Sequence, residues 1–457
     1  MKNASAWFAA LGGALVIGTM AWSEAIVQQP DKKDGRVIVT YWEKWTNFEA
    51  DAMRVVVEEF NRSQDKIYVE YLSVSNVSNK TMLSTAGGIP PDVAGLFGGN
   101  VAQYASNGAV MPLDELAKEA GIEREQYIPV YWNMCTYRGK LWALPTTPAS
   151  TALHYNKGIL EEAGLDPNKP PTTIEELDEM DAKILKRDAA GKIVKMGFLP
   201  TEPGWWPWSW PSFFGGSLWN GYDKITMATP ENIRAYEWVR SYTKRYGLGT
   251  VQAFQQGFGG FDSPQNGFLD NKLASVIQGV WMYNFITKHN PEMKWAAVPF
   301  PHPEDRPDKA NTTVIDLDVL VIPRGAKHPK EAFEFIKFVQ SQKGMELLCL
   351  GQKKHSPLIK VSDEFIQAHP NPYVMLFAQQ ALSVNAASPP KTPIWPQWGD
   401  EIKTALERIN TDPNLSVKDA LEAVEKKMQV QLDRVLESER KLGILPEDGS
   451  RPAEDQL

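Results

Sequence analysis

Strand-like and helix-like stretches alternate along the first part of the chain, and this alternation limits the fold more than any other feature. Arg36 to Trp42 alternates like a half-buried strand, and residues 48–60 carry apolar side chains at helical spacing. Ile67 to Leu72 and Asp92 to Phe97 are two further predicted strands, with one helix between them and another directly after Phe97. The order β-α-β-α-β-α indicates a doubly wound α/β lobe.

The middle of the chain contains a segment of a different kind. From Leu141 to Asn156, two apolar stretches flank the residues Pro-Thr-Thr-Pro-Ala-Ser, which predict a turn near Pro145 to Ser150. Such a segment suits a crossing between two lobes. Helix starts are predicted at the Thr46-x-x-Glu49 capping box, at Thr172–Thr173 and at Ser416. Strands are predicted over residues 274–279, 294–299 and 312–322.

Length and charge restrict the class of protein. The 457 residues are 43% hydrophobic, which is typical of a globular chain of two or three domains. A formal net charge of −8 argues against a nucleic-acid partner, because no basic stripe is available to meet phosphates. The two cysteines, Cys135 and Cys349, are interpreted as inert buried thiols, with one disulfide as the alternative. Six scattered histidines predict no metal site, and no cofactor is predicted.

The N-terminus reads as an export signal. Residues 1–25 combine Lys2 with the apolar run WFAALGGALVIGTM and small residues that suit cleavage. An uncleaved segment would instead remain as an N-terminal anchor. No cysteine lies nearby to carry a lipid. We therefore predict a periplasmic or other extracytoplasmic location, with membrane contact only through this segment.

Aromatic residues are concentrated in one loop, Gly204 to Asn220, which reads GWWPWSWPSFFGGSLWN. Prolines and glycines prevent a long regular element here. A loop with this much aromatic surface typically presents some of it to a half-apolar ligand such as the C–H faces of a sugar. The alternative is an aromatic cluster that fastens the loop to its own domain. The candidates for ligand contact are Trp205, Trp206, Trp208 and Trp210.

A series of sequence blocks extends through nearly all of the chain after the signal segment. The blocks are VTYWEKWTNFEADAMRVVVEEFNRS, PPDVAGLFGGNVAQYASNGAVMPLDELAKEAG, GKLWALP, LHYNKGILEEAGLDPNKPPTTIEEL, FLDNKLASVIQGVWM, AVPFPHPEDRP and VIPRGAKHPKEAFEFIKFVQS. Their order resembles that of extracellular solute-binding protein family 1, the sugar-binding components of ABC importers that include maltose-binding protein.

The resemblance implies two doubly wound α/β lobes joined by crossing strands, the type II periplasmic-binding-protein-like fold, with a ligand cleft between them. Carried onto this chain, lobe 1 would comprise residues 36–146 plus 279–314. Lobe 2 would comprise residues 152–275 plus 320–457. The lobes would close on the ligand by a hinge motion, and the closed form would be recognised by the permease.

Ligands of doubly wound sheets lie beyond the carboxyl ends of the strands. This rule selects Glu43, Trp45 and Asn47 after the first strand, and Gly99 and Asn100 after the third. Glu43 would accept hydrogen bonds from hydroxyls, or else be a solvated turn carboxylate. Trp45 would stack on the ligand or pack against the helix start. Asn100 would bind ligand or only cap its helix.

The resemblance adds candidates later in the chain. Trp281 occupies a family position that often stacks against sugar, and Trp395 and Trp398 resemble a segment at the cleft edge. Asp316 and Asp318 depart from the Gly-rich family pattern at the last crossing; alternation places both on one strand face, towards either the cleft or an interlobe contact. The loop from Lys353 to Pro357 matches one that often lines the cleft, although its lysines are expected to be solvated.

These observations together predict an exported, monomeric solute-binding protein of an ABC importer. It would bind a sugar or oligosaccharide in an interlobe cleft and deliver it to permease subunits. The alternatives are a polyamine or glycerol-phosphate binder, a lectin-like adhesion protein, and a carbohydrate-active enzyme. The enzyme is disfavoured because no Ser-His-Asp or Cys-His signature is present, although Glu43, Asp316 and Asp318 include possible glycosidase pairs.

Overall fold

A computed structural model of the chain describes residues 32–446. The predicted signal segment, residues 1–25, lies outside the described residues. Between residues 32 and 446, no helix has the length and apolar character needed to cross a membrane.

The described chain alternates between strands and helices in its first part and is mainly helical after β12. The strands are β1 (Lys32–Lys33), β2 (Arg36–Glu43), β3 (Ile67–Ser73), β4 (Val93–Phe97), β5 (Thr136–Tyr137), β6 (Lys140–Leu141), β7 (Leu144–Asn156), β8 (Lys186–Arg187), β9 (Ile193–Lys195), β10 (Ser275–Gly279), β11 (Trp295–Val298), β12 (Thr313–Val321) and β13 (Ala386–Ala387). The α-helices are α2 (Asn47–Ser63), α3 (Val77–Ala86), α4 (Val101–Ser106), α5 (Asp114–Glu119), α6 (Pro129–Met134), α7 (Lys157–Glu162), α8 (Ile174–Ile184), α9 (Trp210–Phe213), α10 (Pro230–Tyr246), α11 (Leu248–Gln255), α12 (Met282–His289), α13 (Pro329–Gln340), α14 (Gln342–Gln352), α15 (Asp363–Ala368), α16 (Val374–Ala381), α17 (Trp395–Thr411) and α18 (Val417–Lys441). Single 3-10 turns cover η1 (Gly98–Asn100), η2 (Arg124–Gln126), η3 (Pro207–Ser209) and η4 (Pro307–Lys309).

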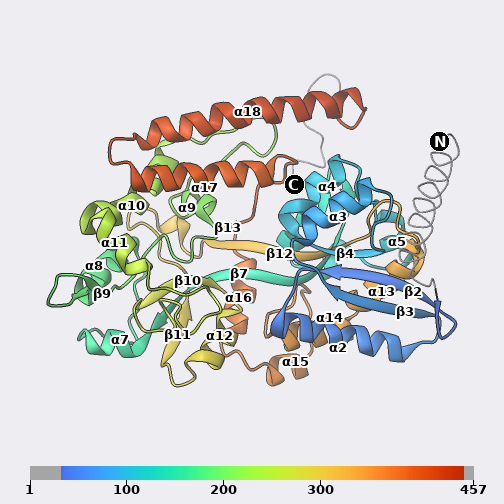
Figure 1. The fold of residues 1–457 in the computed structure, drawn as a ribbon, viewed down its shortest axis with the longest axis horizontal. Coiled ribbons are helices and arrows are strands. Elements are labelled where there is room, and N and C mark those ends of the chain that lie inside the picture. Colours follow the sequence, from blue (N-terminus) through green and yellow to red (C-terminus); the bar gives the residue numbers. More distant parts are fainter. Residues whose placement is uncertain (1–31, 447–457) are drawn as a thin grey trace, which may run out of the picture.

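One sheet runs through the whole molecule. Along its main path the strand order is β1-β2-β4-β12-β7-β10, with β3 on β2, β11 on β7 and β13 on β12. Strands β3, β2 and β4 are parallel and are connected through α2 and α3, as the alternating sequence pattern predicted. β7 and β12 pair antiparallel and cross between the two halves of the molecule (Figure 1). The predicted α/β fold with crossing strands is confirmed.

Two large hydrophobic clusters divide the molecule into halves. The first half packs residues 39–144 together with residues 315–381, and the second packs residues 153–314 together with residues 394–445. In Figure 1 the first half lies on the right and the second on the left, with α17 and α18 along the top. The predicted lobe boundaries disagree with these clusters, because residues 279–314 pack in the second half and residues 320–350 pack in the first.

The predicted turn at Pro145 to Ser150 is wrong. β7 continues through both prolines as one strand of 13 residues. Pro148 pairs with Leu317 and Pro145 with Val319, and the register shifts between these two residues of β12. Proline has no N–H to donate, so it is tolerated in a sheet where a bulge interrupts the ladder. The bulge therefore lets a proline-containing strand cross the molecule without turning.

The predicted capping box at the start of α2 is also wrong. Thr46 occupies the N-cap position, but its side chain makes no capping hydrogen bond. The carboxylate of Glu49 instead accepts a hydrogen bond from the Lys354 ammonium, 2.7 Å away. By contrast, Thr173 and Ser416 cap their helices as predicted.

The C-terminal helix α18 connects the two halves. Its Glu439 carboxylate is buried and accepts hydrogen bonds from Tyr137 (2.6 Å), Ser106 (3.1 Å) and the guanidinium of Arg138 (2.9 Å), all in the first half. Most of the apolar face of α18 packs in the second half. Both cysteines are buried free thiols, so the disulfide alternative is wrong.

Candidate functional site

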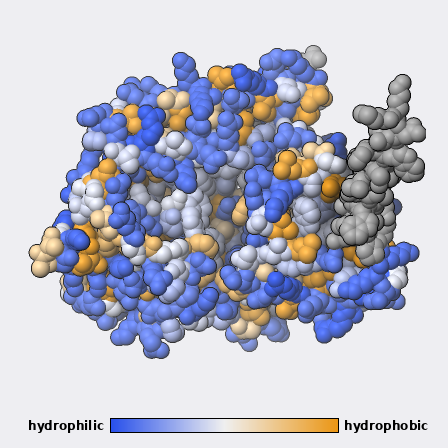
Figure 2. All heavy atoms as spheres, in the orientation of Figure 1, coloured by the Kyte–Doolittle hydropathy of each residue, from blue (hydrophilic) through white to orange (hydrophobic). Residues whose placement is uncertain are grey.

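A cavity of about 460 Å³ lies at the carboxyl ends of β2 and β4 and beside the middle of β12, and residues from both halves line it. This volume falls within the range of small-molecule binding sites. The face of the molecule in Figure 2 is hollowed near its centre, between the two halves. The lining residues are Lys44, Trp45, Thr46, Phe48, Glu49, Phe97, Ala149, Trp205, Trp206, Phe261, Trp281, Phe285, Asp316, Leu317, Asp318 and Lys354. We call this the central cavity.

Aromatic rings form one wall of the central cavity. The Trp281 ring lies 5.9 Å from Trp205 and 6.0 Å from Trp206, between ring centroids. Trp205 contacts Phe261 edge-on at 4.8 Å, and Phe261 in turn contacts Phe285 at 5.4 Å. Trp205 and Phe261 are exposed, so the wall offers ring faces that are not fully packed by protein. Flat apolar surface of this kind suits the C–H face of a sugar ring.

The position of Trp281 depends on the glycine that ends β10. The ring lies so close to Gly279 that a Cβ there would be only 2.3 Å from a ring carbon. The indole Nε1 donates to the Gln278 side chain at 3.1 Å, which fixes the orientation of the ring. The sequence Gln-Gly-Val-Trp thus holds one face of Trp281 against the backbone and leaves the other towards the central cavity.

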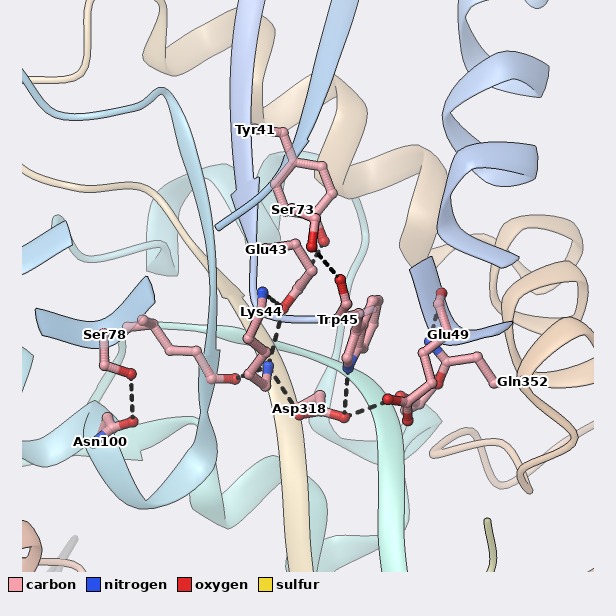
Figure 3. A network of polar contacts seen from close by, with 12 residues as sticks. Tyr41, Glu43, Lys44, Trp45, Glu49, Ser73, Ser78, Asn100, Asp318 and Gln352 are labelled. Carbon is pink, nitrogen blue, oxygen red and sulfur yellow. Dashed lines mark hydrogen bonds and ion pairs between the residues drawn. The ribbon is translucent and has the colours of Figure 1, made fainter. Parts of the chain in front are cut away.

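Charged side chains form the opposite wall, around Asp318. One carboxylate oxygen lies 2.9 Å from the Lys44 ammonium, and the other lies 3.7 Å from the Lys354 ammonium. The second oxygen also accepts hydrogen bonds from Trp45 Nε1 (3.3 Å) and the Thr147 hydroxyl (3.2 Å). Figure 3 shows the Trp45 ring with its nitrogen pointing at Asp318. Asp318 is therefore saturated by protein donors.

Electrostatics separate the two aspartates of β12. Burial alone would raise the pKa of Asp318, but the ammonium groups of Lys44 and Lys354 hold that pKa below its usual range. For Asp316, burial raises the pKa to about 7, and the negative charge of Asp318 adds to this effect. The Leu317 N–H, which donates to Asp316 at 2.8 Å, opposes the rise only in part. The prediction that both side chains share one strand face is confirmed, since both line the central cavity.

The raised pKa of Asp316 predicts a pH-dependent gain in stability for Asp316→Asn. A carboxyl with a folded pKa near 7 and an unfolded pKa near 3.9 destabilises the folded state increasingly as the pH rises through this interval. Asparagine removes that effect. We expect the variant to be more stable than the parent, with a gain about 2 kcal/mol larger at pH 8 than at pH 5.

Urea unfolding of both proteins at the two pH values measures this difference, because titrations elsewhere in the chain cancel in the comparison. An equal gain at pH 5 and pH 8, or a loss at pH 8, would contradict the assignment.

Six of the predicted site residues line the central cavity, namely Trp45, Trp205, Trp206, Trp281, Asp316 and Asp318. Glu43 does not. It is buried beneath Lys44, where its carboxylate accepts hydrogen bonds from the Tyr41 hydroxyl (2.6 Å) and from the backbone and ammonium nitrogens of Lys44. Figure 3 shows this stack of side chains. Its hydrogen-bonding capacity is used inside the protein, so the prediction of direct ligand contact fails for Glu43.

Three more predicted residues lie away from the central cavity. Asn47 is exposed at the start of α2, with a φ of 50°. Asn100 accepts a hydrogen bond from the Ser78 hydroxyl at 3.3 Å and points away from Asp318 in Figure 3, without capping α4. Gly99 lines a smaller hollow of about 290 Å³ with Trp219, and a Cβ at Gly99 would lie 3.1 Å from the Trp395 ring.

Four predicted tryptophans belong to the core of the second half. Trp208 and Trp395 contact each other edge-on at 5.4 Å, and Trp398 is fully buried beside Trp395. Trp210 packs against Phe213, Trp238 and Phe300. For the loop residues Trp208 and Trp210, the structure supports the alternative of a cluster that fastens the loop, and Trp395 and Trp398 pack in the same core instead of lining the central cavity.

The sequence interpretation missed several residues of the central cavity. Lys354 was expected to be solvated, yet only 2% of its side chain is exposed, because it pairs with Glu49 and Asp318. The carboxyl-end rule also places Lys44 after the first strand, between Glu43 and Trp45, but Lys44 was not among the predicted ligand contacts. Phe48, Phe97, Phe261 and Phe285 carry no local sign of their position. Within residues 32–446, no group of His, Cys, Asp or Glu is arranged to hold a metal ion.

The sequence profile of the bacterial extracellular solute-binding proteins matches residues 45–346. The chain belongs to this family. The predicted resemblance is thereby confirmed. The matched region begins just after β2 and includes both crossing strands, the aromatic loop and α13.

The chain is similar to proteins that have different ligands. The sn-glycerol-3-phosphate-binding periplasmic protein UgpB of Brucella abortus is 25% identical over 307 residues. That alignment covers 61% of this chain and about 66% of the relative. The solved structure of CpMnBP1 with mannotriose bound is 25% identical, with a TM-score of 0.76, and covers 86% of this chain and 99% of its own. UgpB of Mycobacterium tuberculosis in complex with glycerophosphocholine, at 21% identity, has a TM-score of 0.70 over 88% of this chain and 100% of its own.

Proposed function

We propose that this solute-binding protein is the extracytoplasmic component of an ABC importer, and that it binds a sugar or short oligosaccharide in the central cavity. The observation that carries the proposal is the pairing, in one cavity, of an aromatic wall around Trp281 with the Asp316 carboxylate, which accepts a hydrogen bond only from the Leu317 N–H among the described residues. Aromatic faces bind the apolar faces of sugar rings, and carboxylates accept hydrogen bonds from their hydroxyls. The mannotriose-bound relative supports this ligand class.

The two halves suggest how binding would be signalled. Trp45, Asp316 and Asp318 come from the first half, whereas Trp205, Trp206 and Trp281 come from the second. A ligand that contacts both walls stabilises the closed arrangement relative to an open one. We propose that β7 and β12 act as the hinge and that permease subunits recognise the closed form of a monomer.

Glycerol phosphate is the second candidate, because the Brucella relative binds it. Phosphate needs free cationic or backbone donors. Both lysines of the central cavity are already engaged with carboxylates, so the charge arrangement favours the sugar. We also propose that the chain is not an enzyme, since a glycosidase needs two available carboxyl groups and Asp318 is held by four protein donors.

The residues ahead of the described chain complete the proposal. Residues 1–25 would direct export and then be cleaved or remain as an anchor. Contact with the membrane would otherwise come only through the permease. Periplasmic relatives of the same family support this location.

A thermal-shift screen tests the proposed ligand class. The protein without residues 1–25 is heated with mono- and oligosaccharides, polyamines and glycerol 3-phosphate. A ligand that binds only the folded state adds about 2.7 kcal/mol of stability at one hundred times its dissociation constant. We expect a raised midpoint with one class of sugar. A rise with glycerol 3-phosphate alone would select the second candidate, and no rise with any compound would contradict the proposal.

A further inference from the structure

The ionisable groups that line the central cavity are unequal in number. Three carboxylates, Glu49, Asp316 and Asp318, face two ammonium groups, Lys44 and Lys354. A further carboxylate, Glu43, lies directly beneath Lys44. The cavity therefore has an excess of negative charge when all of these groups are ionised.

Both lysine ammonium groups of the cavity are engaged by acceptors of the protein. The Lys44 ammonium has three acceptors: Glu43 at 3.1 Å, the Leu96 carbonyl at 3.1 Å and Asp318 at 2.9 Å. An ammonium group has only three N–H bonds. Lys354 is placed similarly, with Glu49 at 2.7 Å, the Thr147 hydroxyl at 3.5 Å and Asp318 at 3.7 Å. The positive charges of the cavity are thus already paired with carboxylates of the protein.

Asp316 differs from the other carboxylates. Its single hydrogen bond within the described residues comes from the Leu317 backbone N–H, and no lysine or arginine there lies within ion-pairing distance. The ammonium groups of Lys44 and Lys354 both lie within ion-pairing distance of the neighbouring Asp318 and not of Asp316. A carboxylate that is half-buried without a counter-ion is unfavourable unless something else neutralises it. The raised pKa of Asp316 reflects the same burial without a counter-ion.

The rings of Trp205, Trp206 and Trp281 lie across the central cavity from β12. Indole faces attract cations through the negative charge of the ring face. The lysine ammonium groups illustrate this here, with Lys354 5.7 Å from the Trp281 centroid and Lys44 5.3 Å from that of Trp45. A carboxylate without a counter-ion and an indole wall in one cavity together form a site for a positively charged amino group.

We infer that the natural ligand carries a positively charged amino group for which Asp316 is the counter-ion. The inference rests on the proposed function only in taking the central cavity as the ligand site. An amino sugar fits both the proposed function and this inference, because its ring suits the indole wall and its ammonium group suits Asp316. A polyamine shares the ammonium group but not the sugar frame, so the experiment separates the two sources.

Isothermal titration with matched ligands tests the inference. Glucosamine, mannosamine and galactosamine are each compared with their parent sugars and their N-acetyl derivatives, as monosaccharides and as β-1,4-linked disaccharides. Putrescine, spermidine and glycerol 3-phosphate form separate arms. We expect at least one amino sugar to bind at least tenfold more tightly than both of its uncharged counterparts, as a charge-assisted hydrogen bond allows.

Two variants make the test specific. Asp316→Asn, which is expected to be more stable than the parent, should reduce the preference for the amino sugar to within about twofold. Glu422→Gln removes the same charge from the exposed face of α18 and should leave the preference intact.

The outcomes distinguish this inference from the proposed function. Neutral sugars that bind as tightly as amino sugars, or a preference that survives in Asp316→Asn, would overturn the inference and leave the sugar proposal standing. Binding of polyamines alone would support the inference and contradict the sugar. Tight binding of glycerol 3-phosphate, or no binding by any ligand, would overturn both.

Discussion

Replacement of Asp318 by asparagine is expected to destabilise the protein by about 3 kcal/mol, as the loss of one partner from a buried ion pair typically does. Asp318 is 7% exposed and is shared by the ammonium groups of Lys44 and Lys354. Glu43 and Glu49 would keep one acceptor for each lysine, but neither could neutralise both. An amide in place of the carboxylate would also replace one acceptor oxygen by an N–H₂ group that faces one of the two ammonium groups. Urea unfolding at pH 7 measures the change.

Glu422→Gln serves as the control for this measurement. The pair between Lys418 and Glu422 is 3.6 Å long, with both side chains more than half exposed, so its loss is expected to change stability by less than about 0.5 kcal/mol. If Asp318→Asn is as stable as this control, the ion pairs of Asp318 with Lys44 and Lys354 do not contribute to the stability of the fold.

Replacement of Trp281 by alanine is expected to weaken ligand binding by roughly 100- to 1000-fold, the range seen when a central aromatic anchor is truncated. Trp281 is the ring that Trp205 and Trp206 both contact, and Gly279 holds it flat against the backbone. Alanine would remove this ring face from the aromatic wall. Titration with the sugar that gives the largest thermal shift provides the dissociation constants.

Two companion variants sharpen the result for Trp281. Trp281→Phe keeps a flat ring in the same place and should lose about tenfold in affinity, since it retains part of the stacking surface. Trp219→Ala alters the smaller hollow that contains Gly99 and should change affinity little. A large loss with Trp219→Ala and none with Trp281→Ala would move the ligand out of the central cavity.

The sequence predicted the local elements well, because their signals are local. Apolar alternation in Arg36 to Trp42 and the helical spacing over residues 48–60 correspond to β2 and α2 within a few residues. The helix start predicted at Thr172–Thr173 is present, with Thr173 as the N-cap of α8. The carboxyl-end rule also placed Trp45 at the site, since it depends only on strand order.

The failures concern contacts between distant parts of the chain. Pro145 and Pro148 predicted a turn, but they flank a bulge of β7 whose partner residues on β12, Leu317 and Val319, are more than 150 residues away in the sequence. The sequence predicted Lys354 as part of a solvated run, because its partners Glu49 and Asp318 lie far away in the sequence. The density of tryptophan likewise could not show which rings face the core. Trp208 and Trp210 pack inside, while Trp205 and Trp206 face the central cavity.

The lobe boundaries failed for a similar reason. They were carried over from a resemblance, which places the residues before β12 in lobe 1 and those directly after it in lobe 2. The hydrophobic clusters place these two segments the other way round. Hydrophobic periodicity shows that residues 329–340 form a helix, but it does not show which half of the molecule that helix covers.

A crystal structure of the protein with the sugar that binds most tightly would test the central claim most directly. The account predicts a ring stacked on the Trp281 face, within the wall formed with Trp205 and Trp206, and a polar group of the ligand within hydrogen-bonding distance of Asp316. A ligand bound in the hollow beside Gly99 and Trp219, with the central cavity unchanged, would contradict it.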